Sequence, residues 1–222
     1  MASTHTPNLA KDLIIIHKVI TRGLEVGLSN GKTYLQTGFA QPQLIPGYSS
    51  YIHSLASVLD AHHTGEDLIA FPEFRKLIPS APYLRLATDH QKIEELLEFV
   101  PSALHDLTGD TLQHGLQVLV DTLERITDVW YPHIQLEEHY FSEEVISQVM
   151  QLGQQAAIST AISKHSQEHS EPAHCIIPFI LFNLEQDDRL SFSASLPPTV
   201  INELVPGEWK DLWAPMKPYL LG

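Results

Sequence analysis

The sequence predicts an all-α protein, a helical bundle followed by an additional helix and a C-terminal extension rich in proline and aromatic residues. Several segments repeat apolar residues every three or four positions, which is the period of an amphipathic helix. On three of these segments a histidine and a glutamate four residues apart stand where the pattern requires apolar side chains. Burying an ionised carboxylate costs several kcal/mol unless a cation compensates it, so the pattern indicates a metal inside the bundle.

Length, charge and cysteine content limit the class of protein. The 222 residues, 43% of them hydrophobic, are enough for one sizeable core, so we expect a single domain over residues 1–222. The net charge of −14, with only 13 Lys and Arg, argues against nucleic-acid or membrane partners. The lone Cys175 cannot form an internal disulfide, and the apolar run Leu13 to Ile16 is too short for a signal peptide or a membrane span. We expect a cytoplasmic location.

The first helix is expected over Lys11 to Leu28, where it would end in the C-cap signature Ser29-Asn30-Gly31. His17 lies on its apolar face. Taken alone, such a histidine is more often a hydrogen-bonded core residue than a ligand. Residues 31–50 have no periodicity, so they are expected to form a long irregular connection.

The second helix, expected over Tyr51 to Ala70, carries the first pair. His62 and Glu66 occupy its inward seam, and Pro72 should stop or bend the helix. His63 and Asp67 repeat the four-residue spacing on the flank of the seam. They fit equally well as support for the site and as a solvated pair.

The third helix is expected over Tyr83 to Val100 and should be closed by Pro101. Its seam reads Tyr83, Ala87, His90, Glu94 and Leu97, so His90 and Glu94 form the second pair.

The fourth helix, expected within Asp110 to Phe141, has the clearest periodicity of the chain. The third pair, His133 and Glu137, lies near its C-terminal end. Pro132 removes one backbone donor directly before His133 and should kink the helix there. The bundle is therefore expected to span about residues 11–141.

Two further segments follow the bundle. A supporting helix is expected over about residues 142–166, where the apolar residues stay in register without a proline. The segment of about residues 171–222 contains recurring prolines and aromatic residues, so we expect it to pack on the bundle without long helices. We further expect this tail to cap the mouth of the bundle and to shape access to the metals.

The three pairs and His17 are expected to converge. Residues four apart stand one above the other on a helix, so each pair can present an imidazole and a carboxylate to one point. Seven ligands are too many for one ion but suit two ions bridged by carboxylates. The alternative, a bundle of buried salt-linked histidines without metal, would leave three core glutamates uncompensated. The candidate metal ligands are His17, His62, Glu66, His90, Glu94, His133 and Glu137.

The chain resembles the hemerythrin-like, or HHE, family over roughly Asp12 to Phe141. The residues that carry the resemblance are His17, the His62-His63-x-x-Glu66-Asp67 signature with Phe71-Pro72 after it, Asp89-His90, and His133 with Glu137-Glu138. The resemblance implies an up-down four-helix bundle with a non-haem di-iron centre. By position, Glu66 and Glu137 would bridge the irons, His17 and His62 would bind one iron, and His90, Glu94 and His133 would bind the other.

Two departures from the oxygen-carrying members bear on function. Those members have a histidine where Glu94 stands, and they space the last pair by five residues with an aspartate instead of by four with Glu137. The extra carboxylate charge favours oxidation over reversible binding. We therefore expect a protein that binds and activates dioxygen with two iron ions and oxidises a small organic substrate. The alternative is a non-catalytic sensor, carrier or buffer for dioxygen, nitric oxide or iron. The substrate and the oligomeric state stay open.

Overall fold

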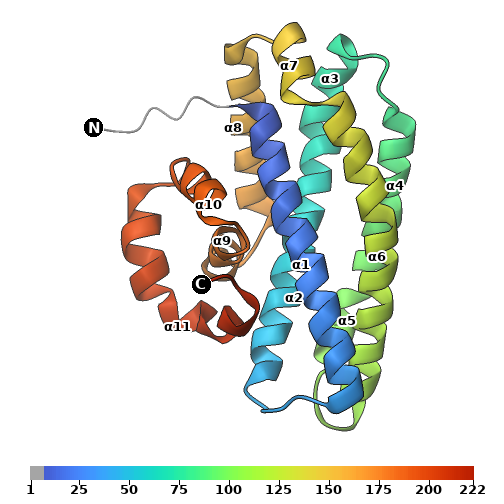
Figure 1. Cartoon of the computed structure of the whole chain (residues 1–222), viewed down its shortest axis with the longest axis vertical. Helices are drawn as coiled ribbons and strands as arrows, with labels where there is room; N and C mark the ends of the chain where they lie inside the picture. Colours follow the sequence, from blue (N-terminus) through green and yellow to red (C-terminus); the bar gives the residue numbers. More distant parts are fainter. Residues whose placement is uncertain (1–7) are drawn as a thin grey trace.

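Four long helices form the bundle and lie side by side along the length of the molecule, alternating in direction (Figure 1). The computed structural model describes residues 8–222, so residues 1–7 of the expected domain lie outside it. Within the described range every regular element is helical, and the all-α prediction is confirmed. In the bundle α1 packs against α2 and α6, and α6 also packs against α4. These helices are α1 (Leu9–Thr37), α2 (Leu44–Gly65), α4 (Tyr83–Leu97) and α6 (Leu112–Tyr140).

α1 is longer than the sequence predicted, because Gly31 lies inside the helix and is not part of a cap. Gly31 is buried, and a Cβ atom there would approach the hydroxyl of Tyr48 to 2.5 Å. The glycine therefore permits close packing of α1 on α2. The helix stops instead at Gly38, whose φ of 71° suits a residue without a side chain. The irregular connection is correspondingly short, residues 38–43.

α2 also continues further than predicted. It passes into a π-helical turn, η1 (Glu66–Ala70), and then directly into α3 (Phe71–Leu77). Pro72 lies in the first turn of α3, where a missing backbone N–H costs little, so it does not stop the chain of helices. π-helical turns inside α-helices are frequent at functional sites.

Prolines also mark the other half of the bundle. α4 ends at Leu97, and Pro101 does not close it but lies in the first turn of a separate short helix. Pro132 lies inside α6, which continues past it to Tyr140. The connecting elements are α5 (Val100–His105) and the 3-10 turn η2 (Gly109–Thr111).

The expected supporting helix is divided into α7 (Glu143–Val149) and α8 (Leu152–His169). The backbone is extended at Met150 and Gln151, and Gln151 forms a capping box with Gln154 that starts α8. The cap therefore begins a new helix where apolar periodicity alone predicted a continuous one. α8 packs against α2, η1 and α1.

The C-terminal tail is a set of short helical elements beside the bundle (Figure 1). It contacts mainly the first half of α2, where the Tyr51 hydroxyl donates to Asn183 Oδ1 at 2.8 Å. Gly47 allows the closest approach, because a Cβ atom there would lie 2.0 Å from the carbonyl oxygen of Pro215. The elements are α9 (Ala173–Phe182), α10 (Gln186–Ser193), the π-helical η3 (Val200–Glu208), α11 (Lys210–Trp213) and the 3-10 helix η4 (Ala214–Tyr219).

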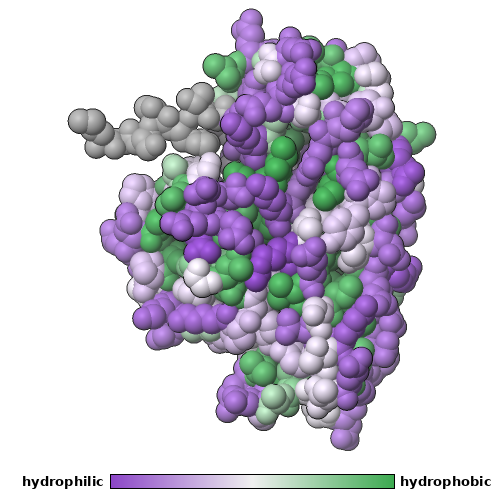
Figure 2. Space-filling model, in the orientation of Figure 1, coloured by the Kyte–Doolittle hydropathy of each residue, from purple (hydrophilic) through white to green (hydrophobic). Residues whose placement is uncertain are grey.

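The buried hydrophobic residues form two separate cores. The larger core lies between the long helices and the tail and includes Leu59 and Trp130. The smaller core gathers Phe71, Phe74 and Phe141 near α3 and α7. On the outside, the face shown in Figure 2 is mostly hydrophilic, with hydrophobic residues in small separate patches. In the part of the chain that is described, no helix is long and apolar enough to cross a membrane.

Candidate metal centre

A cluster of histidines and glutamates lies inside the bundle, in contact with both hydrophobic cores. Its members, named here the central cluster, are all buried, and their nitrogen and oxygen atoms form three overlapping groups, each with its atoms within 4.8 Å of one another. Every long helix of the bundle contributes. The central cluster consists of His17 from α1, His62 and His63 from α2, Glu66 from η1, His90 from α4, and His133 and Glu137 from α6.

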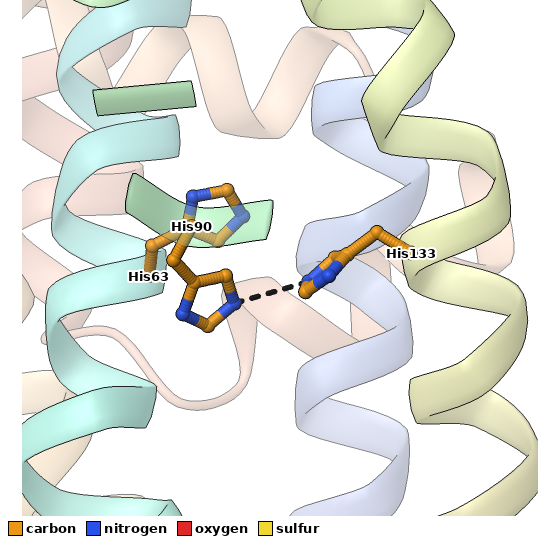
Figure 3. Close-up of side chains that lie close together, drawn as sticks. All are labelled: His63, His90 and His133. Carbon is orange, nitrogen blue, oxygen red and sulfur yellow. Dashed lines mark hydrogen bonds between the residues drawn. The ribbon is translucent and has the colours of Figure 1, made fainter. Parts of the chain in front are cut away.

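Two of the groups share their carboxylates. One contains His17 and His62, the other contains His90 and His133, and both contain Glu66 and Glu137. The third group consists of His63, His90 and His133 (Figure 3). Two donor sets joined by two common carboxylates are the arrangement expected for a pair of metal ions in a bundle.

The Nε2 atoms of the imidazoles point to the middle of the cluster. His17 Nε2 lies 3.3 Å from Glu137 Oε2, and His133 Nε2 lies 3.3 Å from Glu137 Oε1. On the α2 side, His62 Nε2 lies 3.5 Å from Glu66 Oε2. His90 and His133 are hydrogen-bonded through their Nε2 atoms at 3.0 Å (Figure 3). Glu137 is thus surrounded by donors from three helices.

Two half-exposed carboxylates contact the outer nitrogen atoms of two of these imidazoles. Nδ1 of His17 donates to Oε1 of Glu138 at 3.1 Å, and Nδ1 of His90 lies 3.0 Å from Oδ2 of Asp67. A carboxylate at the outer nitrogen fixes the tautomer and orientation of a ligating histidine. The sequence spacing paired Asp67 with His63, whereas the structure places Asp67 against His90.

Aromatic rings cover the central cluster on two sides. Trp130 meets His17 edge to face with ring centroids 5.7 Å apart, and its indole N–H is turned away to donate to Thr21 Oγ1. On the other side Phe71 stacks on His90 at 5.5 Å. Sequence spacing did not predict the contact of Trp130 with the cluster. The two rings help to keep water out of the site.

The two glutamates differ in their electrostatic surroundings. Burial tends to raise the pKa of Glu137, but the charges and hydrogen bonds of His133, His17 and His90 outweigh burial and hold its pKa well below the usual range. The pKa of Glu66 is raised well above the usual range by burial and by the charge of Glu137. Without metal, one carboxylate of the pair is ionised and the other keeps its proton.

The histidines divide in a similar way. Burial and the neighbouring imidazoles lower the pKa values of His62 and His63 well below the usual range, so both rings are neutral and carry a free lone pair. Burial also tends to lower the pKa of His90, but Asp67 and Glu137 outweigh it and raise the pKa to about 9. Neutral imidazole is the form that binds metals.

Unsatisfied polar atoms test whether a metal fits this site. Within residues 8–222 no hydrogen-bond partner is found for Nε2 of His17, His62 or His63, for Oε2 of Glu66, or for either carboxylate oxygen of Glu137. Each buried polar atom left without a partner costs about 1–3 kcal/mol. Metal ions at the two donor sets would engage these atoms of His17, His62, Glu66 and Glu137, so the residues present fit a metal centre.

Glu94 does not take part in the central cluster. Its side chain is exposed, and it belongs to none of the three groups. The seam predicted for α4 was wrong after His90, because the residues that face inward are Leu86, His90, Ile93 and Leu96. His63, by contrast, is buried within the cluster. The signal for it was present in the His62-His63 doublet, but helical spacing placed it on the flank.

A small cavity borders the central cluster at His63 and His90. Its volume is about 20 Å³, and its lining comes from α2, η1 and α4. The tail does not contribute to this lining and contacts α2 through Gly47, Tyr51 and Ser54, before the cluster begins at His62. The lining of this cavity therefore gives no support to a capping tail, which stays a prediction. The lining residues are Asp60, His63, Thr64, Asp67, His90, Glu94 and Leu97.

Comparison with known proteins identifies the same stretch of the chain. The family model of the hemerythrin HHE cation-binding domain matches residues 17–145. This range begins at His17 and contains every member of the central cluster. No curated protein and no solved structure gives a significant match.

Proposed function

Because the chain belongs to the hemerythrin HHE cation-binding family, we propose that its metal-binding cluster holds two iron ions and that the loaded centre binds a diatomic ligand, dioxygen or nitric oxide. The observation that carries the proposal is the pair of donor groups that share Glu66 and Glu137. A single ion at the group with His17 and His62 would leave the other group empty and Nε2 of the neighbouring His63 without a partner. Two ions account for both.

The residues of the central cluster perform distinct tasks in this proposal. Imidazole Nε2 atoms and carboxylate oxygens are suitable ligands for iron, and Glu138 and Asp67 orient two of the imidazoles from behind. Glu66 holds a proton while the site is empty of metal and must release it when it becomes a ligand, so loading is favoured by higher pH. When bound, a pair of ferrous ions supplies the electrons and the open coordination position that a diatomic ligand needs.

The size of the small cavity beside the central cluster decides which ligand is favoured. A cavity of about 20 Å³ has room for a molecule about the size of water. Pockets that bind organic molecules usually measure about 300–1,000 Å³. A cavity of this size therefore favours a ligand of two atoms over an organic substrate beside the metals.

Oxidation of a small organic substrate, expected from the sequence, is the second candidate function. A cavity of about 400 Å³ is present, large enough for such a molecule. Its walls include Phe182, Arg189 and Trp213 of the tail, and no member of the central cluster lines it. This separation is the reason for ranking binding of a diatomic ligand above oxidation of an organic substrate.

The test is to load the purified chain with ferrous iron without oxygen and to count the bound metal. We expect two irons per chain, and we expect Glu137→Gln to lose both, because Glu137 belongs to both donor groups. Asp128→Asn, at an exposed position of the same helix, is the matched control and should keep both. Near-zero iron in the unaltered chain would end the proposal, and two irons in Glu137→Gln would refute the shared-carboxylate assignment.

The loaded protein is then offered ligands of increasing size. Nitric oxide should change its optical spectrum, and tert-butyl isocyanide should not, because the cavity of about 20 Å³ beside the cluster is too small for it. If the bulky ligand binds as readily as nitric oxide, the organic-substrate function takes precedence. Exposure to dioxygen followed by a purge with inert gas separates the remaining classes, because recovery of the ferrous spectrum indicates a carrier or sensor and its loss indicates an oxidase.

A further inference from the structure

The sequence pattern predicted Glu94 as a ligand together with His90 and His133. In the structure His63, and not Glu94, forms a group with these two histidines. We infer that His63 is the third imidazole ligand of the metal position formed by His90 and His133, and that Glu94 is not a ligand. This inference rests on the proposed metal centre and specifies which residues hold its second ion.

The position of the His63 ring is that of a ligand. Its ring stacks on that of His90 with centroids 4.1 Å apart and planes at 16°, and its centroid lies 5.4 Å from that of His133. The ligand atoms of the three rings lie within 4.8 Å of one another, and the rings come from α2, α4 and α6 (Figure 3). Three imidazoles from three helices thus surround one point.

Two other roles for His63, a packing residue of the core and a solvated pair with Asp67, do not agree with the structure. A histidine kept for packing is normally hydrogen-bonded, but in the described range Nε2 of His63 has no partner although the side chain is only 5% exposed. A solvated pair with Asp67 is also excluded, because Asp67 lies against Nδ1 of His90. Nε2 of His63 is buried, has no hydrogen-bond partner and lies next to two candidate ligands, which is the situation expected for a metal ligand.

Glu94 lies one turn after His90 and lines the same small cavity, but it belongs to none of the donor groups. Ile93 is fully buried and takes the inward position one turn after His90, which leaves Glu94 exposed at the outer end of the small cavity. Placing Glu94 in the position of Ile93 would require a rotation of α4 of about 100°, the angle between neighbouring residues of an α-helix, and would expel Ile93 from the core.

The identity of this ligand, His63 or Glu94, determines the charge of the site. With His63 as a ligand the centre has five neutral imidazoles and the carboxylates of Glu66 and Glu137, whereas Glu94 would have added a third carboxylate. A ligand set with less negative charge stabilises the ferric state less. Without Glu94 the centre lacks the extra carboxylate charge that would favour irreversible oxidation, and this ligand set favours reversible binding.

Metal binding by three variants tests the inference. His63→Gln removes the proposed ligand, Glu94→Gln removes the rejected one, and His114→Gln removes an exposed histidine of α6 as a control. Each metal-free protein is first checked for native helix content by circular dichroism and is then titrated with ferrous iron without oxygen in competition with a chelator. We expect His63→Gln to bind one iron where the unaltered chain, Glu94→Gln and His114→Gln bind two.

A second measurement needs no substitution and decides the question if His63→Gln does not fold. In the cobalt(II)-loaded unaltered chain, proton resonances of metal-bound imidazole N–H groups are shifted outside the normal range and can be counted with ¹⁵N-labelled histidine. We expect signals from five histidines, whereas four would exclude His63. Loss of one iron by Glu94→Gln with full loading of His63→Gln would overturn the inference. Failure of the unaltered chain to bind metal would instead overturn the proposed function.

Discussion

The His-x-x-x-Glu pair of α2 and the pair of α4 have the same spacing but different positions in the structure. In α2 both His62 and Glu66 are buried in the central cluster. In α4 only His90 is buried there, and Glu94 faces solvent. Four-residue spacing shows that two side chains share a helix face, but it does not show which face the bundle buries beyond the first of them.

The neighbouring residues explain the difference. After His90 the sequence offers two continuations, Ile93 with Leu96 or Glu94 with Leu97, and both have helical spacing. The structure buries the first, because it places an isoleucine instead of a glutamate in the core. α2 has no such competitor, since the residue three positions after His62 is Gly65. At Glu66 the helix also changes to a π-helical turn, whose hydrogen bonds span five residues instead of four.

The largest expected effect is on the free energy of unfolding of the protein. It tests whether Ile93 or Glu94 is the residue of α4 that is buried in the core. Ile93→Ala should lower the free energy of unfolding by about 2–5 kcal/mol, because it leaves a cavity in the core. Glu94→Ala should change it by less than about 0.5 kcal/mol, since the side chain is exposed. Urea denaturation of the metal-free proteins measures both. A larger cost for Glu94→Ala than for Ile93→Ala would show that α4 is rotated in solution.

An intermediate effect concerns the carboxylate partner of His90, which comes from η1 instead of α4. Asp67→Asn should weaken iron binding by about 10–100-fold, because the carboxylate at Nδ1 of His90 is lost. Glu94→Gln is the matched control, since it removes one negative charge from the lining of the same cavity without touching a ligand. A competition titration with a chelator gives both affinities. Equal losses would mean that the charge of the cavity, and not the contact with His90, determines the affinity.

The smallest expected effect is a dependence of stability on pH. The pKa of Glu66 is raised in the folded metal-free protein by burial and by Glu137. At a pH below the unfolded-state pKa of 4.5 the group is protonated in both states, and as pH rises above that value only the unfolded chain releases the proton. Glu66 therefore lowers stability progressively as pH rises towards its folded-state pKa.

Glu66→Gln should remove this loss. We expect the metal-free variant to match the unaltered chain near pH 4 and to exceed it increasingly at higher pH, as measured by urea midpoints from pH 4 to 8. Glu137→Gln should show the opposite sign, because the pKa of Glu137 is lowered, so its stabilisation is complete above pH 4.5 and is lost as pH falls below that value. A flat difference for Glu66→Gln would show that Glu66 is not buried in the metal-free state.

Periodicity predicted much of the fold and most of the cluster, and the errors have a common physical origin. Where one seam alone fitted, as around His133 and Glu137 in α6, the predicted residues lie in the cluster. Where two seams fitted, as in α4, the sequence could not choose, and the seam with Glu94 was preferred over the seam with Ile93. Gly31 was misjudged for a related reason. A glycine required for a close contact with Tyr48 looks in the sequence like a glycine required for a helix end.

The tail was harder to predict, because its position depends on contacts distant in sequence. Proline and aromatic content indicated that it is packed, but not where. Its place beside α2 depends on the close approach of Pro215 to Gly47 and on the hydroxyl of Tyr51, which donates to Asn183. Neither contact has a local sequence pattern.

The division of the interior into two hydrophobic cores has a consequence for cooperativity. The central cluster touches the larger core through Trp130 and the smaller core through Phe71, so it is the layer at which the two halves of the bundle meet. Without metal this layer contains several buried polar atoms without partners, so it stabilises the contact between the two cores less than apolar packing would. The halves can then open as separate units. Ligands drawn from every long helix make the loaded centre a crosslink between them, so that local opening of one half becomes global unfolding of both.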